Sequence, residues 1–148
     1  MAPLLTGKDS IAPWQILAED LKGALSANNL DDFCSRLKPF FADIPYDLPI
    51  PLERYYQTVF YMLLKFMGAE IMTEERTNMG RIDAVLQTPT HTYVVELKMG
   101  RSAQEALQQI RQKQYAQKYQ LSGKLVTALG LAFDPQTKNI VDQAWQVL

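Results

Sequence analysis

The sequence predicts an α/β protein: a helix, a three-stranded meander, a second helix and two further strands, preceded by a helical extension. Three observations support this fold class. The 148 residues are enough for one domain with a core, and 47% hydrophobic with 21% charged content is typical of a soluble globular protein. Apolar residues recur at helical spacing as far as Gly68, at strand spacing after it, and at helical spacing again between residues 102 and 121. Turn-forming residues separate the strand-like segments.

The first 50 residues are predicted to form a helical lead-in and a proline-rich connector. Residues 11–29 and 30–44 space their apolar residues at intervals of three and four, with Ser10 and Asn29 as candidate N-caps. This pattern indicates two amphipathic helices. The segment IPYDLPIP that follows cannot continue a helix, because proline lacks the backbone N–H, so we expect an extended connector.

Residues 51–148 are predicted to form the core, in one compact domain with the lead-in. LERYYQTVFYMLLKFMG is apolar almost all round and ends at Gly68, so we expect a buried helix. EIMTEERT, RIDAVLQ and TYVVELKM have the alternation or apolar runs of three strands. A capping box of Ser102 and Glu105 opens the next helix. KLVTALGLAF is apolar on both faces, which favours a central strand, and NIVDQAWQVL is the last strand.

Composition excludes several classes of protein. A single cysteine, Cys34, and a single histidine rule out a disulfide framework or a zinc-ligand set. There is no apolar run of about 18 residues and no signal peptide pattern, so we expect no membrane partner and a cytoplasmic location. The net charge of −1 gives no global attraction to nucleic acid. Residues 98–124 are locally basic, which indicates either a phosphate-attracting strip or a solvated helix face.

The hairpin GRIDAVLQTPTHTYVVELKMG carries charges on strands that should be buried. If its loop runs from Thr88 to His91, strand pairing places Asp83 directly opposite Glu96. Two carboxylates at that separation repel each other, unless one binds a proton or a cation lies between them. Oxygen ligands suit Mg²⁺ or Mn²⁺, and Lys98 projects beside them on the same face. The pattern therefore predicts a divalent metal site.

Glu53 is a further candidate, because it continues the apolar stripe of the helix that precedes the meander. It either reaches the same site or stabilises the N-terminus of its own helix. Both interpretations stay open.

The arrangement of Asp83, then Glu96-Leu97-Lys98, on a meander followed by a helix and a strand resembles the PD-(D/E)XK nuclease superfamily. More narrowly, six segments in order resemble the nuclease-like domain found C-terminal to an AAA-type ATPase in many bacterial proteins of unassigned function. These segments are FFADIPYDLPI, ERYYQTVFYMLLKFMG, RTNMGRIDAVL, VVELKM, EALQQIRQKQYAQKY and GLAFDPQTKNI. The resemblance implies a restriction-endonuclease-like core and an ATPase domain in the same longer chain.

Carried onto this sequence, the resemblance makes Asp83 and Glu96 metal ligands, together with the backbone carbonyl of Leu97. It implies Mg²⁺ as the ion, with Mn²⁺ as a substitute. Lys98 would position or activate the attacking water, and Glu53 would be the acid contributed by the first core helix.

Two departures from the superfamily pattern stand out. Ile82 occupies the place of the proline in the superfamily name, which leaves the ligand unaffected. Some members carry Gln-x-x-x-Tyr on the next helix, whereas here Tyr115 lies six residues after Gln109. Residues expected to meet nucleic acid are Arg101, Gln109, Lys113 and Tyr115, although surface solubility explains the polar ones almost as well.

Two functions are compatible with these residues. The first is a metal-dependent nuclease that hydrolyses phosphodiester bonds in DNA or RNA. The second is a binding module that keeps the nuclease fold with little or no turnover and docks nucleic acid or protein.

Overall fold

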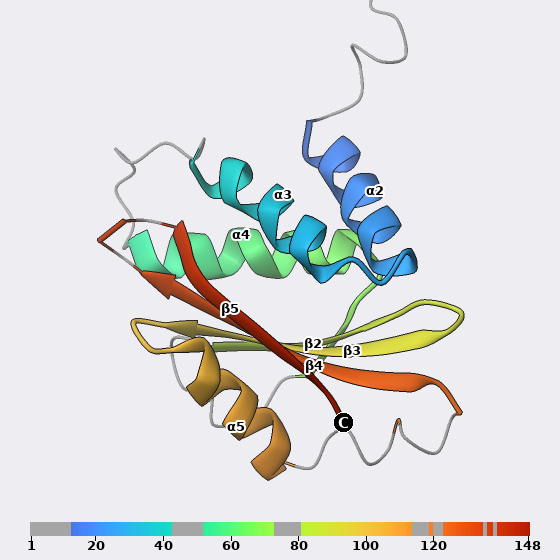
Figure 1. Ribbon diagram of the computed structural model, residues 1–148. Helices are drawn as coiled ribbons and strands as arrows, with labels where there is room; N and C mark the ends of the chain where they lie inside the picture. Colours follow the sequence, from blue (N-terminus) through green and yellow to red (C-terminus); the bar gives the residue numbers. More distant parts are fainter. Residues whose placement is uncertain are drawn as a thin grey trace, which may run out of the picture.

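The computed structural model describes residues 13–42, 52–72, 81–113, 119, 123–134, 136–137 and 139–148. The elements are α2 (Pro13–Ser26), α3 (Leu30–Ala42), α4 (Leu52–Phe66), β1 (Glu70–Met72), β2 (Arg81–Gln87), β3 (His91–Met99), α5 (Ala103–Lys113), β4 (Leu125–Asp134) and β5 (Asn139–Val147). Figure 1 shows the sheet between α2, α3 and α4 on one side and α5 on the other. The predicted α/β class and element order are confirmed.

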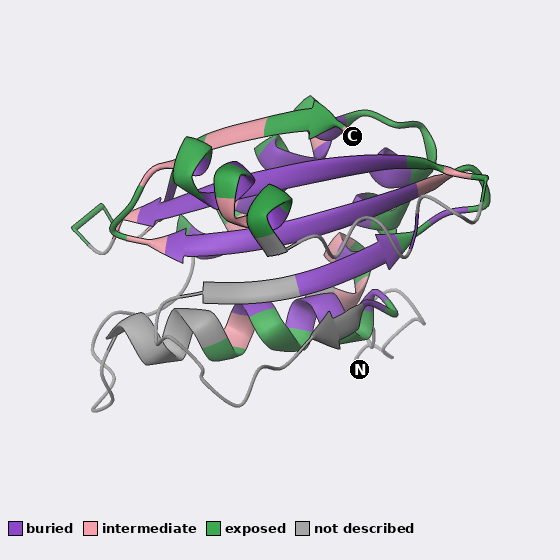
Figure 2. Ribbon diagram, turned by 90° about the horizontal axis from the view of Figure 1, so that it is seen from below, coloured by how far each residue is buried: buried purple, intermediate pink, exposed green. Residues whose placement is uncertain are grey.

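The five strands form one mixed sheet in the order β1-β2-β3-β4-β5. Strands β1, β2 and β3 form the predicted antiparallel meander, and β5 is antiparallel to β4. β3 and β4 are parallel, so the chain crosses over through α5 to connect them. β4 lies inside the sheet and is buried from Val126 to Phe133, as its apolar sequence predicts (Figure 2).

The two sides of the sheet carry separate apolar clusters. Side chains of α2, α3 and α4, including Phe33 and Phe60, pack on Val95 and Leu97 of β3. On the opposite side, α5 packs on the second cluster, whose buried residues are Val85, Val94, Leu107, Ile110, Tyr119, Val126 and Ala128. The sheet therefore has an α4 face and an α5 face.

Helix α4 differs from its prediction. It is not buried all round, because Tyr61, Met62 and Phe66 are exposed. Among its described side chains, Phe60 and Leu64 are fully buried in the cluster on the sheet. A helix in a single covering layer keeps an outer side, even when its sequence is apolar there.

Both α2 and α4 end in a left-handed residue. Gly68 has φ of 83°, and Ala69 N–H donates to the Leu64 carbonyl at 2.9 Å, which confirms the predicted end of α4. Asn28, with φ of 54°, has the same role after α2. Asn29 then caps α3 as predicted, since its Oδ1 accepts the Asp32 N–H at 3.0 Å. The other predicted cap, Ser10, lies outside the described residues.

Tyr93 joins the lead-in helices to the sheet. Its side chain is fully buried on the α4 face, and its hydroxyl lies 3.0 Å from the Leu25 carbonyl and 2.7 Å from Asn28 Oδ1. The single hydroxyl proton is donated to these two acceptor oxygens, the Leu25 carbonyl and Asn28 Oδ1. The α2–α3 corner is thus fixed to β3 by a buried hydrogen bond, 65 to 68 residues away in sequence.

Candidate active site

The strand register confirms that Asp83 lies directly opposite Glu96. Thr88 N–H donates to the His91 carbonyl at 2.9 Å, so residues 88 and 91 form a hydrogen-bonded pair. Such pairs alternate along an antiparallel ladder, which makes residues 83 and 96 a non-hydrogen-bonded pair. At these positions Cα atoms are only about 4.5 Å apart and side chains are closest.

Glu96 and Lys98 lie on the α5 face of the sheet. Side chains alternate along β3, and Val94 belongs to the cluster beneath α5. Position 83 falls on the same face of β2, two residues before Val85 of that cluster. The side chain of Asp83 is outside the described part of the structure, so its pairing is established from the backbone.

The carboxylate of Glu96 and the ammonium of Lys98 form a buried ion pair. Lys98 Nζ lies 3.8 Å from Glu96 Oε2, while only 1% of Glu96 and 6% of Lys98 are accessible. Removing charged groups from water is costly, and a structure keeps them buried only with compensating partners. A strand that otherwise needs apolar residues therefore holds an acid and a base together on one face.

The N-terminus of α5 lies next to this pair. Gly130 of β4 is the register partner of Glu96, and a Cβ atom there would lie 2.5 Å from the Ala103 carbonyl oxygen and 2.9 Å from Ala106 Cβ. Only glycine permits this approach. The sequence reasoning missed Gly130, although an isolated glycine inside an apolar strand is a signal of close backbone contact.

The predicted capping box at the start of α5 is confirmed. Ser102 Oγ accepts the Glu105 N–H at 3.1 Å. Arg101 donates to Glu105 at 3.2 Å, and this hydrogen bond lowers the pKa of the Glu105 carboxyl. Asp142 of β5 adds a carboxylate at the same helix end, where its Oδ2 accepts the Ala103 N–H at 3.4 Å. The sequence reasoning did not select Asp142.

The remaining predicted site residues are not brought together by described contacts. Glu53 lies in the first turn of α4, whose buried side covers the other face of the sheet, and its side chain is not described. Gln109 is half-buried on α5. The side chain of Lys113 and all of Tyr115 are outside the described residues. Leu97 is buried and, by ladder alternation, forms a hydrogen-bonded pair with Ile82, so its carbonyl faces β2.

Three basic residues of the predicted strip have partners within the protein. Arg101 contacts Glu105, Arg111 donates to Gln146, and Lys124 Nζ donates to Gln87 at 3.0 Å. These three contacts lie at separate points along the α5 side.

The donor set suits a hard divalent cation. Among side chains that the structure describes, no group of three or more His, Cys, Asp or Glu could hold a metal. Asp83 is not among these side chains, and its backbone lies opposite the buried carboxylate of Glu96. Two carboxylates opposed across a strand pair, beside backbone carbonyls, fit the oxygen coordination of Mg²⁺ or Mn²⁺.

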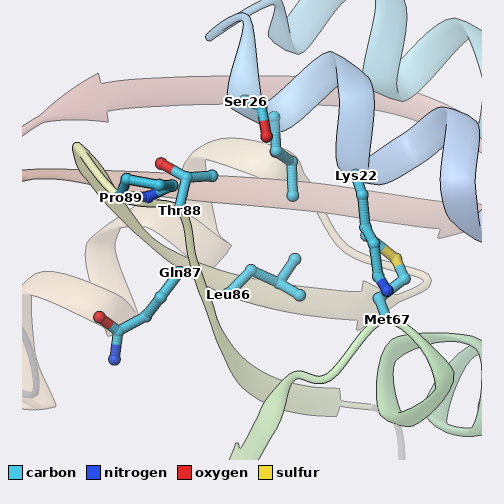
Figure 3. Close-up of a pocket in the computed structure, with 8 residues that line it drawn as sticks. Lys22, Ser26, Met67, Leu86, Gln87, Thr88 and Pro89 are labelled. Carbon is cyan, nitrogen blue, oxygen red and sulfur yellow. The ribbon is translucent and has the colours of Figure 1, made fainter.

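Two hollows lined by described residues lie on the α4 side and include neither Glu96 nor Lys98. One, of about 200 Å³, lies between α2, the end of α4 and the β2–β3 turn, and Figure 3 shows Lys22 reaching toward Met67 there. The other, of about 350 Å³, lies beneath the α2–α3 corner.

A comparison with protein families matches residues 52–143 to the PD-(D/E)XK nuclease superfamily. The chain belongs to this superfamily. The match includes the opposed strands β2 and β3 and helix α5. Helices α2 and α3 lie before the matched region.

Among curated proteins, the chain is similar to the "Uncharacterized protein in vnfD 5'region" of Azotobacter chroococcum mcd 1. The two are 35% identical over 124 residues, which cover 79% of this chain and 24% of that protein. The chain thus spans about a quarter of its relative's length. No solved structure matches it. Within the described ranges, every helix is too short or too polar to cross a lipid bilayer.

Proposed function

We propose that this member of the PD-(D/E)XK superfamily is a metal-dependent nuclease that hydrolyses phosphodiester bonds in DNA or RNA. The observation that carries the proposal is the opposition of Asp83 and Glu96 across β2 and β3, with Lys98 Nζ 3.8 Å from the Glu96 carboxylate. Superfamily membership supports the reaction class. Mg²⁺ is the proposed ion, with Mn²⁺ as a substitute.

The roles of the residues follow from their charges and positions. Asp83, Glu96 and the Leu97 carbonyl would hold the ion, which when bound would neutralise phosphate charge and acidify a water molecule. The Lys98 ammonium lies beside this site, where it orients the attacking water or stabilises negative charge that develops on the phosphate. Burial strengthens both effects, since electrostatic interactions are larger away from bulk water.

The surface that guides the nucleic acid is proposed along α5. Arg101, Gln109, Lys113 and Tyr115 follow the active-site strand in the chain and would contact phosphates or stack on a base. Glu53 is proposed as an additional acid of the active site. For this role its side chain must extend beyond the edge of the sheet, from the α4 face to the side that carries Glu96. A Glu53→Gln variant separates that role from helix-end stabilisation, because only the catalytic role predicts lost cleavage with unchanged stability.

The test is cleavage of supercoiled plasmid, single-stranded DNA and RNA with Mg²⁺, with Mn²⁺ and with a chelator. We expect metal-dependent cleavage that falls by about 100-fold or more in Asp83→Asn, Glu96→Gln and Lys98→Met. Glu19→Gln is the matched control, because Glu19 is an exposed acid on α2 and its loss should leave cleavage unchanged. Equal cleavage by wild type and the three variants would point to a contaminant and refute the assignment.

A second function, a nucleic-acid-binding or protein-binding module with little turnover, is favoured by one observation. Glu96 and Lys98 are almost inaccessible, so a phosphate reaches them only if the groups that cover them move. Binding measured by fluorescence anisotropy distinguishes the two functions. Affinity that survives both chelation and Glu96→Gln, without cleavage, would support the binding module.

We also propose that the chain works in the cytoplasm as one part of a longer protein that contains an AAA-type ATPase domain. The proposal is supported by the sequence resemblance and by the relative, of which this chain covers 24%. An immunoblot of the native host with an antibody against this chain tests it. A band near 16.9 kDa in place of a much larger one would count against it.

A further inference from the structure

Strand β5 is an edge of the sheet with hydrogen-bonding groups directed outward. Leu148 N–H donates to the Val126 carbonyl at 2.8 Å, which makes residues 126 and 148 a hydrogen-bonded pair. By alternation, Ala144 and Gln146 bond to β4, whereas the backbone groups of Gln143, Trp145 and Val147 face away from it. No further strand pairs with β5 among the described residues. Edges of this kind accept an additional strand.

Two of these outward-bonding residues, Trp145 and Val147, present apolar side chains on the α4 face. Trp145 and Val147 are 39% and 59% exposed, and as register partners of Leu129 and Thr127 they lie on the α4 face of the sheet. Figure 2 shows the contrast with β4, which is buried from Val126 to Phe133. Exposed apolar residues that line an open strand edge mark an interaction surface.

A hollow of about 350 Å³ adjoins this edge, and its walls have a distinctive chemistry. Trp145 and Val147 form one side, and Asn29 and Asp31 at the α2–α3 corner form the other. Trp145 offers an aromatic surface, and Asp31 offers a carboxylate. An aromatic ring and a carboxylate together favour a cation and disfavour a phosphate.

Two other acids of the α2–α3 corner are paired with a cation. Asp20 and Asp32 are bridged by Arg36, at 3.3 and 3.0 Å. This pairing leaves Asp31 as the acid of the corner that lines the hollow. The hollow lies on the α4 side and includes neither Glu96 nor Lys98, so it is separate from the proposed nuclease site on the α5 face.

We propose that β5 is a docking edge for an extended peptide segment of another protein that carries a lysine or arginine. The segment adds to the sheet through the outward groups of Gln143, Trp145 and Val147. Its cationic side chain enters the hollow, against the ring of Trp145 and close to Asp31. Main-chain hydrogen bonds supply affinity, and the cation supplies specificity.

The first experiment probes an array of random twelve-residue peptides with the intact protein. We expect the bound peptides to share one lysine or arginine within a strand-forming sequence. Asp31→Asn should weaken their binding about tenfold or more, and Trp145→Leu should do the same, whereas the exposed control Glu19→Gln should not. The chain has two tryptophans, so Trp14→Phe leaves Trp145 as the fluorescence reporter for the titrations.

Amide hydrogen exchange with a selected peptide then locates the contact. Protection gained at Gln143, Trp145 and Val147, with no change at Ala144 and Gln146, supports strand addition. The proposal is overturned if no peptide binds, if binding needs no cation, or if protection appears elsewhere. Concentration-dependent dimers whose contact protects β5 would also overturn it, because the occupant would then be a second copy of this chain.

Discussion

Gly130 and Ala103 are in such close contact that a Cβ atom at position 130 would lie 2.5 Å from the Ala103 carbonyl oxygen. The obstructing atom belongs to the backbone of α5, so it cannot move without shifting the helix. We expect Gly130→Ala to lower the free energy of unfolding by about 1–3 kcal/mol and to reduce cleavage, because α5 would move away from Glu96. Urea unfolding followed by circular dichroism measures the first effect.

Gly23→Ala is the matched control for this variant. Gly23 lies within α2, and a Cβ atom there would meet nothing within 4 Å. Alanine should therefore stabilise the protein by up to about 1 kcal/mol. If both substitutions changed the free energy of unfolding equally, the tight contact between α5 and β4 would be contradicted.

Replacement of Tyr93 by Phe tests the connection between the lead-in and the sheet. The change leaves the Leu25 carbonyl and Asn28 Oδ1 without their donor, at a cost of about 1–3 kcal/mol. Burial raises the pKa of the Tyr93 phenol above its usual value. As the pH rises, the phenol therefore ionises in the unfolded chain before it ionises in the folded protein. The stabilisation by the Tyr93 hydroxyl is present below pH 10 and declines as the pH rises further. In Tyr93→Phe that contribution to the alkaline decline should be absent.

Cys34 should report unfolding through its reactivity. Burial raises the pKa of its thiol from 9.0 to about 12, so the reactive thiolate is scarce in the folded protein at pH 8. We expect a thiol-specific reagent to label the native chain slowly and the urea-unfolded chain quickly. Between pH 9 and 12 the unfolded state releases this proton more readily, so stability should fall as the pH rises. Rapid stoichiometric labelling under native conditions would contradict the burial of Cys34.

Removal of the Ser102 hydroxyl tests the cap of α5. Ser102→Ala deprives the Glu105 N–H of its acceptor and should cost about 1 kcal/mol. Ser35→Ala serves as the comparison, because Ser35 is exposed within α3 and alanine there should be neutral or slightly stabilising. Equal melting temperatures for the two variants would show that the cap contributes nothing.

Binding of Mn²⁺ should raise the melting temperature, independently of any cleavage. A ligand that binds only the folded state, and is present at 100 times its dissociation constant, raises the free energy of unfolding by about 2.7 kcal/mol. We expect this increase in wild type and in Glu19→Gln, and its loss in Asp83→Asn and Glu96→Gln. A metal response that survives both active-site substitutions would place the ion elsewhere.

Local sequence rules predicted most of the fold. The pairing of Asp83 with Glu96 followed from loop length and the two-residue period of strands, both of which are local. The caps at Asn29 and Ser102 and the glycine end of α4 depend on a few adjacent residues. The exposure of Met62 could not be predicted in this way, because an apolar sequence does not say which of its sides another layer will cover.

The assembly of the site depends on contacts between distant segments. Gly130 and Asp142 reach the N-terminus of α5 only after β4 and β5 have joined the sheet. The glycine inside an apolar strand signals a close contact but not its partner, and nothing near Asp142 in the sequence identifies its role. For Glu53, the local pattern was correct but the position of its helix in the fold could not be predicted. The helical period identified its stripe correctly as one that packs on the sheet, but it could not show that α4 covers the face opposite Glu96.

The anchoring of Tyr93 has a practical consequence for anyone who shortens this chain. A fragment that begins where the superfamily match begins, at residue 52, would discard both acceptors of the Tyr93 hydroxyl and uncover the apolar side of the strand that carries Glu96 and Lys98. Such a fragment should aggregate or lose activity for reasons unrelated to its chemistry. We therefore expect the minimal stable unit to be larger than the region that matches the family.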